Sequence, residues 1–199
     1  MKEKKAKLKT RDLIYAGAFA AIYLIVLFIV VMVFGMIPIL YIIAPLIVGI
    51  INATIYMMYV SKVKKFGAIF ILAILFGGIM SASGHIYAII VAVVVGLVAE
   101  LIAKNNAYQS KKMITLSYAV FNLTMVGPFL TMYTATEAFV EETRMYYGDV
   151  YAEAIAGFVG NFGWMLLVGQ IVLAIIGALI GGVLGTVLFK KHFEKAGLV

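Results

Sequence analysis

Few residues of this chain have side chains that could carry out catalysis. The 199 residues include two histidines and no cysteine, which excludes thiol catalysis, disulfides and cysteine metal sites. His85 lies close to Ser81 and Ser83, and a hydroxyl beside an imidazole is the pairing that a serine nucleophile needs. There is no GxSxG motif, however, and no acidic residue in the neighbouring apolar segments would orient the imidazole. We therefore expect no enzyme, and a membrane-embedded hydrolase that uses His85 with Ser81 or Ser83 is the alternative hypothesis.

The sequence also lacks an energy source of its own. No Gly-Lys dipeptide occurs, so the phosphate-binding loop GxxxxGK[ST] is absent and the chain is not itself a P-loop ATPase. Buried acids and histidines for a proton relay are missing as well. Glu100 is the only acidic residue within an apolar segment, and we expect its carboxylate to reach water at the membrane interface. We expect this chain to bind no cofactor and no metal.

The composition is that of a membrane protein. Hydrophobic residues make up 65% of the chain and charged residues only 13%, which is about half of what a soluble domain carries. The net charge of +7 would suggest nucleic acid in a soluble protein. Here the basic residues flank apolar segments, so their placement indicates orientation in a lipid bilayer instead, with no nucleic-acid partner.

Apolar segments of roughly 20 residues predict transmembrane helices, and the whole chain is expected to form one all-α membrane domain. The expected helices are residues 13–34, 36–60, 67–82, 86–103, 113–133 and 164–189. Pro45 is expected to kink the second helix, because proline removes one backbone donor. The sequence GGIMSASGH is the expected turn between the third and fourth helices.

Six passes place both chain ends on one side of the membrane. All Lys and Arg residues except Arg144 fall in the segments on that side, which the positive-inside rule makes cytoplasmic. The acidic connection at residues 134–163 is then an outer loop. Its residues Tyr146, Tyr147 and Tyr151 would allow part of it to rest as a helix on the membrane surface.

Polar side chains within the apolar segments must be hydrogen-bonded or face a cavity. Asn122 falls near the middle of the fifth helix and Gln170 in the outer half of the sixth. An aromatic belt at the interface would explain Tyr133 and Trp164. The alternative is an outward-facing pocket for a small polar solute. The candidate substrate-binding residues are His85, Tyr87, Asn122, Tyr133, Asn161, Trp164 and Gln170.

Small residues recur at four-residue spacing on two of the helices, where they let helix backbones approach closely. The sixth helix contains Gly177, Gly181 and Gly185, for which packing within the bundle is the expected role. The first helix contains two such pairs, Ala16 with Ala20 and Gly17 with Ala21. Packing is the default for these as well, and a docking face for another membrane subunit is the competing interpretation.

Several segments resemble one family of membrane proteins. They are KLKTRDLIYAGAFAAIYLIVLF, the SKVKKFG loop, the SGH turn, SKKMITLSYAVFNL and the ending GGVLGTVLFKKHFEKAGLV. Together they resemble the substrate-binding (S) subunits of energy-coupling factor (ECF) transporters, in the branch called Trep_Strep or Mpt-type. The resemblance covers nearly the whole chain.

The resemblance implies a six-helix protein of a prokaryotic cell membrane that captures a vitamin or similar micronutrient from outside. The implied partners are a transmembrane coupling subunit and two cytosolic ATPase subunits, which use the ATP. The family's small-x-x-x-small motif meets the coupling subunit. It falls here on Gly17 and Ala21, with Ala16 and Ala20 as the offset alternative. A ligand-free membrane scaffold is the remaining hypothesis.

Overall fold

The computed structural model describes residues 9–105 and 107–188, and every regular element within them is a helix. In chain order the elements are α1 (Thr10–Gly35), α2 (Pro38–Ile42), α3 (Ala44–Val63), α4 (Ala68–Ala82), α5 (Tyr87–Lys104), α6 (Lys111–Phe121), the 3₁₀ helix η1 (Asn122–Met125), α7 (Val126–Thr134), α8 (Thr136–Tyr147), α9 (Asp149–Phe162) and α10 (Trp164–Leu188).

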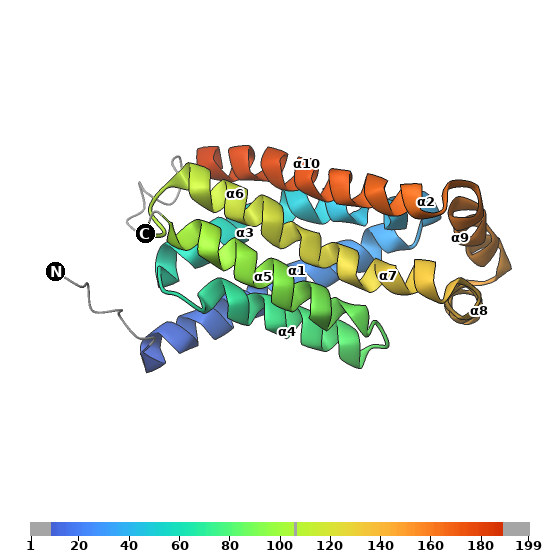
Figure 1. Ribbon diagram of the computed structural model, residues 1–199, viewed down its shortest axis with the longest axis horizontal. Coiled ribbons are helices and arrows are strands. Elements are labelled where there is room, and N and C mark those ends of the chain that lie inside the picture. The colour runs from blue at the N-terminus through green and yellow to red at the C-terminus, as the bar shows by residue number, and fades with distance from the viewer. Residues whose placement is uncertain (1–8, 106, 189–199) are drawn as a thin grey trace.

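The long helices run along one another in a bundle, and α8 and α9 lie across one end of it (Figure 1). Four single helices, α1, α3, α5 and α10, and the combined α6–η1–α7 segment are long and apolar enough to cross a membrane; α4 is a shorter apolar helix of 15 residues. Helices α3 and α10 form the most extensive contact, and α4 packs mainly on α5. The predicted fold class, an all-helical polytopic membrane protein, is confirmed.

Two of the expected spans are interrupted. The predicted helix at residues 36–60 is divided at Ile43 into α2 and α3, because Pro45 has no N–H for the regular bond. The helix continues to Val63, where Lys64 ends it in the left-handed conformation. The predicted helix at residues 113–133 contains the 3₁₀ turn η1, since Pro128 leaves the Thr124 carbonyl without an α-helical donor.

The connection at residues 134–163 is not a loop but two helices, α8 and α9. Gly148 separates them with φ +85°, a backbone conformation that favours glycine. The Arg144 guanidinium pairs with Asp149 across this break. The Tyr151 hydroxyl donates to the carbonyl of Gly35 at 2.6 Å and so ties α9 to the end of α1. These contacts hold both helices against the end of the bundle.

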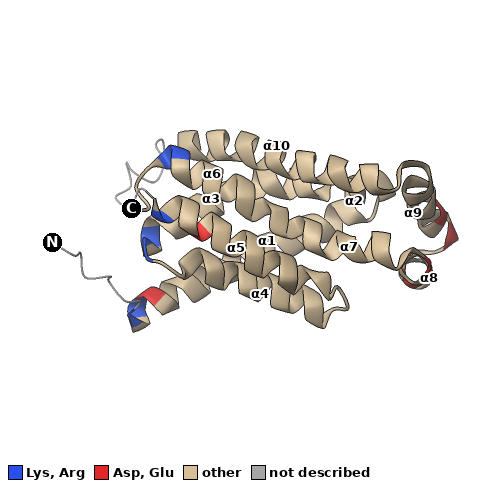
Figure 2. Ribbon diagram, viewed as in Figure 1, with Lys and Arg blue, Asp and Glu red and all other residues tan. Residues whose placement is uncertain are grey.

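Charge divides the two ends of the molecule. Figure 2 shows Lys and Arg at the end where α1 begins and α10 ends, and the acidic residues of α8 and α9 at the opposite end. The first and last described helices therefore have their chain-terminal ends at the same end of the bundle (Figure 1).

Helices α3 and α10 approach so closely that only glycine fits at several positions. A Cβ added at Gly49 would lie 2.7 Å from the Ala178 amide nitrogen, and one at Gly177 would meet the Leu46 carbonyl. A Cβ at Gly181 would meet the carbonyl of Gly49. The predicted role of these glycines in packing within the bundle is confirmed.

Glu100 corrects another expectation, because its side chain is fully buried and does not reach water. Its carboxylate accepts hydrogen bonds from the Tyr108 hydroxyl at 2.6 Å and from the Phe70 amide at 3.1 Å. Phe70 lies in the first turn of α4, where backbone donors have no partner within the helix. Glu100 therefore caps α4 from a neighbouring helix. Burial raises the pKa of Tyr108, which keeps its hydroxyl a donor.

Candidate functional site

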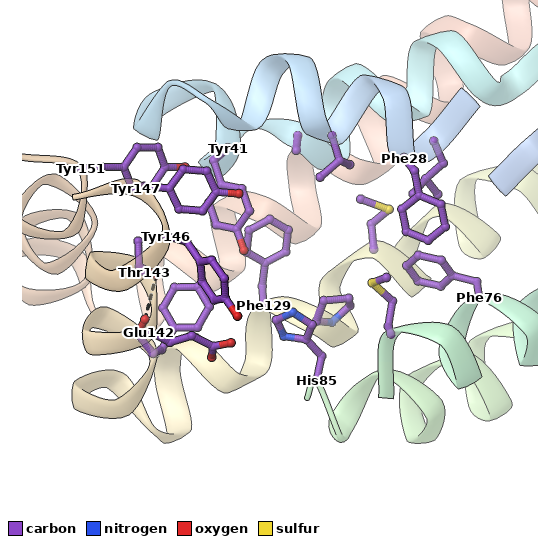
Figure 3. Close-up of a pocket in the computed structure, with 17 residues that line it drawn as sticks. Phe28, Tyr41, Phe76, His85, Phe129, Glu142, Thr143, Tyr146, Tyr147 and Tyr151 are labelled. Atoms are coloured by element: carbon purple, nitrogen blue, oxygen red, sulfur yellow. Dashed lines mark hydrogen bonds between the residues drawn. The ribbon is translucent and has the colours of Figure 1, made fainter. Parts of the chain in front are cut away.

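A cavity of about 280 Å³ lies at the end of the bundle that carries α8 and α9 (Figure 3). Its walls come from α1, α2, α4, η1, α7, α8 and α9, together with the first residue of α3 and the turn between α4 and α5. The lining residues are Leu27, Phe28, Val31, Tyr41, Ala44, Phe76, Met80, His85, Met125, Pro128, Phe129, Phe139, Glu142, Thr143, Tyr146, Tyr147 and Tyr151. Aromatic side chains dominate this set.

Helix α8 supplies one continuous face of the cavity. Its lining residues are Phe139, Glu142, Thr143, Tyr146 and Tyr147, whose spacing of three and four places them on the same side of a helix. Phe139 and Thr143 are buried, and the Thr143 hydroxyl donates to the Phe139 carbonyl at 2.7 Å. Tyr146, Tyr147 and Glu142 are exposed in part, which places them at the mouth.

Aromatic pairs stiffen the remaining walls. Tyr41 packs on Phe129 with ring centroids 5.0 Å apart, and Tyr147 stacks on Tyr151 at 4.7 Å. Such pairs stabilise by about 0.5–1.5 kcal/mol beyond the area they bury. Burial, with a smaller contribution from Tyr147, raises the pKa of Tyr151 to about 12, so its hydroxyl stays protonated and bonded to α1 at neutral pH.

Polar groups in the cavity are few. His85, in the turn between α4 and α5, has a buried Nδ1 with no hydrogen-bond partner in the described residues. Glu142 is the only acidic residue of the lining, and within the described residues no Lys or Arg lines the cavity. Figure 3 shows the His85 ring and the Glu142 carboxylate both directed into the cavity, from different walls.

The hydroxyls predicted to pair with His85 are used elsewhere. The Ser81 hydroxyl accepts from the Ile89 amide at 3.2 Å, and the Ser83 hydroxyl donates to the Ile79 carbonyl at 3.0 Å. Over the part of the chain that the structure describes, neither hydroxyl is hydrogen-bonded to the imidazole of His85. The geometry gives no support to a serine nucleophile at this turn.

Of the predicted substrate-binding residues, the structure places only His85 in the cavity wall. Asn122 and Gln170 are fully buried in the bundle. The Asn122 amide donates to the carbonyls of Pro45 at 2.9 Å and Ala174 at 2.8 Å, and its Oδ1 has no partner among the described residues. Asn122 thus joins α3 to α10.

Gln170 satisfies the backbone at the break between α2 and α3. Its amide donates to the carbonyl of Ile42 at 3.2 Å, and its Oε1 accepts from the Tyr133 hydroxyl at 2.8 Å. Tyr133 in turn stacks on Trp164, with centroids 5.5 Å apart. These three predicted residues therefore form a connected group that supports the helix break, away from the cavity lining.

The other two predicted residues are on the outside of this group. Tyr87 is half-buried at the start of α5, and Asn161 is exposed near the end of α9. Trp164 is also exposed, which is typical of an aromatic residue at the membrane interface. That any of these residues binds a solute stays a prediction.

The two small-residue pairs on α1 face different ways. Ala16 and Ala20 are each 1% exposed and belong to the core of the bundle. Gly17 and Ala21 are on the exposed side, and a Cβ added at Gly17 would meet nothing within 4 Å. Only the second pair is free to contact another membrane protein.

The cavity residues of α8 were missed by the sequence analysis, although a signal was present. The stretch from Phe139 to Tyr147 has a helical period in its apolar and aromatic residues. Averaged over the segment, the acidic residues hide this stripe and favour a loop. The α1 and α4 walls had no such signal, because their lining residues are indistinguishable from other apolar positions in these helices.

The fold and the lining together define an integral membrane protein with an aromatic cavity near one end of its helical bundle. The chain belongs to the Trep_Strep family, described as hypothetical bacterial integral membrane proteins, whose family model matches residues 10–195. The comparisons with curated proteins and with solved structures give no match.

Proposed function

We propose that this protein is the substrate-binding subunit of an ECF-type, ATP-dependent importer, and that it captures a small vitamin-like solute in the aromatic cavity. The observation that carries this proposal is the cavity itself. It has the near-apolar lining and few polar groups that are typical of small-molecule sites. The proposal assigns no catalytic step to this chain.

The charge distribution supports an outward-facing cavity. Lys and Arg gather at the end of the bundle opposite α8 and α9 (Figure 2). Basic residues flanking membrane helices favour the cytoplasmic side. We infer that both chain termini are cytoplasmic and that the cavity opens toward the outside of the bacterial cell.

The exposed face of α1 is the proposed docking surface for a transmembrane coupling subunit. Gly17 and Ala21 leave a shallow strip on this face, and bulky neighbours such as Ile14 and Ile25 are 66% and 57% exposed. Small residues between larger ones allow a second helix to approach closely in a bilayer. Because the sequence has no P-loop, two cytosolic ATPase subunits are the proposed source of energy.

A copurification experiment tests this assignment. The chain is expressed with coupling and ATPase subunits of an ECF transporter from the same bacterium, and with Gly17→Leu and Ala21→Leu combined. We expect the double variant to lose the complex while it keeps its solute, because the docking strip and the cavity are separate. Gly169→Leu, at an open position on α10, adds the same bulk elsewhere and should keep the complex. Complex formation that is equally strong in all three proteins would contradict the proposal.

A further inference from the structure

The charged groups around the cavity are unbalanced. With the histidine neutral, Glu142 is the one charged side chain among the described lining residues. The basic residue nearest to it in the sequence, Arg144, is bound to Glu141 and Asp149. Hydrogen bonding and ion pairing with Asp149 raise the pKa of Arg144, so this pair stays charged and its cation stays engaged. In the described part of the chain, no ion pair involves Glu142. An anionic solute would therefore be repelled from the cavity mouth and a cation attracted.

The aromatic rings add to the same preference. The ring faces of Tyr41, Tyr146, Tyr147 and Phe129 carry the negative side of the aromatic quadrupole, and Figure 3 shows them grouped on the α8 side of the cavity. A cation within about 6 Å of such a ring gains about 0.5–2 kcal/mol, with the larger values in sites that exclude water. The flat rings also suit a flat partner.

The hydrogen-bonding groups point to a donor. A carboxylate only accepts hydrogen bonds, and a neutral imidazole with its proton on Nε2 also accepts at Nδ1. Glu142 and the unpartnered Nδ1 of His85 reach the cavity from α8 and from the α4–α5 turn. A solute with N–H groups would satisfy both acceptors, and a solute with only acceptor oxygens would leave them unpaired.

We infer that the cavity takes a compact, flat solute that carries a positively charged nitrogen with N–H donors, such as a protonated amine attached to an aromatic ring. The volume of about 280 Å³ limits it to a molecule smaller than most drug-sized ligands. This inference rests on the proposed function, because it names the class of solute that the capture cavity takes.

Three probes with the same ring and different charge test the inference: benzylamine, benzyl alcohol and benzoate. Binding is measured by isothermal titration calorimetry at neutral pH, on the full chain in lipid nanodiscs. We expect benzylamine to bind at least about tenfold more tightly than benzyl alcohol, and benzoate to bind most weakly. Glu142→Gln should reduce the advantage of benzylamine about tenfold and change benzyl alcohol less than about threefold.

The matched control is Glu137→Gln, which removes an exposed carboxylate of α8 that does not line the cavity. It should preserve the preference for benzylamine. A preference for benzyl alcohol or benzoate in the unaltered chain would overturn the inference, as would an equal effect of the two glutamine variants or binding of none of the probes.

The outcome for the proposed function is separate. If a neutral or anionic natural solute is retained and the complex with the coupling subunit forms, the inference on charge fails and the importer assignment stands. If benzylamine is selected through Glu142 but no coupling subunit binds, the inference stands and the importer assignment fails.

Discussion

The two halves of this bundle use their residues in opposite ways. The half formed by α3, α6 and α10 is packed without space for a single added carbon at Gly177, and its polar residues Asn122 and Gln170 are bonded to backbone carbonyls. The half formed by α1, α4, α7 and α8 encloses a cavity of about 280 Å³. Its polar groups, Glu142 and the Nδ1 of His85, have no partner of these kinds in the described residues.

This difference teaches that a polar residue in a membrane helix is a poor guide to a binding site. Leaving a backbone or amide group unpaired in lipid is costly, so a helix break such as that at Ile43 recruits polar side chains for support. A solute site needs the reverse, namely polar groups without a partner facing a space. The packed half is thus the scaffold, and we infer that the open half performs the function.

The largest effect is expected from adding bulk to the packed half. Gly177→Leu places a side chain against the Leu46 carbonyl, which cannot move without separating α3 from α10. We expect a loss of folding free energy above about 3 kcal/mol, seen as a failure to give a monodisperse protein in detergent. Gly169→Leu, on the same helix with nothing within 4 Å of its Cβ, should purify normally. Equal yields of the two variants would remove the distinction between a packed and an open half.

A smaller effect is expected from the Asn122 side chain. Asn122→Ala removes the hydrogen bonds to Pro45 and Ala174 and should lower the free energy of unfolding by about 1–3 kcal/mol in an SDS titration. Solute affinity should change less than about threefold, a change below 1.4 kcal/mol. Asn161→Ala, at an exposed position, is the control and should leave stability within about 0.5 kcal/mol. Lost solute binding at unchanged stability would return Asn122 to the binding site.

Much of the fold could be predicted from the sequence, because apolar length is a direct requirement of the bilayer. The turn at Ser83 and Gly84 and the interruption near Pro45 also follow from residue chemistry. The conversion of residues 134–163 into α8 and α9 was not predicted. It depends on contacts far apart in the sequence, such as the bond from Tyr151 to Gly35.

The candidate site could be predicted only in part. His85 was identified because a histidine at a membrane boundary is rare and titratable. The walls from Phe28 and Phe76 were not identified, since the sequence does not state which faces of α1 and α4 turn toward a space and which toward lipid. The register of the docking pair was open for the same reason. Burial of Ala16 and Ala20 resolves which pair is exposed.

The smallest of the three effects is expected at the cavity mouth. Tyr146 is 76% exposed, so Tyr146→Ala should leave stability nearly unchanged. It removes one aromatic face from the cavity and should weaken solute binding about tenfold, or about 1.4 kcal/mol. Trp164→Ala removes an exposed aromatic side chain outside the cavity and should leave affinity unchanged. A larger loss of affinity for Trp164→Ala than for Tyr146→Ala would favour the group around Gln170 as the site.

The central claim is that one solute binds inside the cavity at the end that carries α8 and α9. Native mass spectrometry of the gently purified chain tests it most directly, with Val31→Trp to fill the cavity and Val33→Trp as its lipid-facing control on the same helix. We predict one small molecule per chain in the unaltered protein and in Val33→Trp, and none in Val31→Trp. Retention of the solute by Val31→Trp, or its absence from the unaltered protein, would contradict the account.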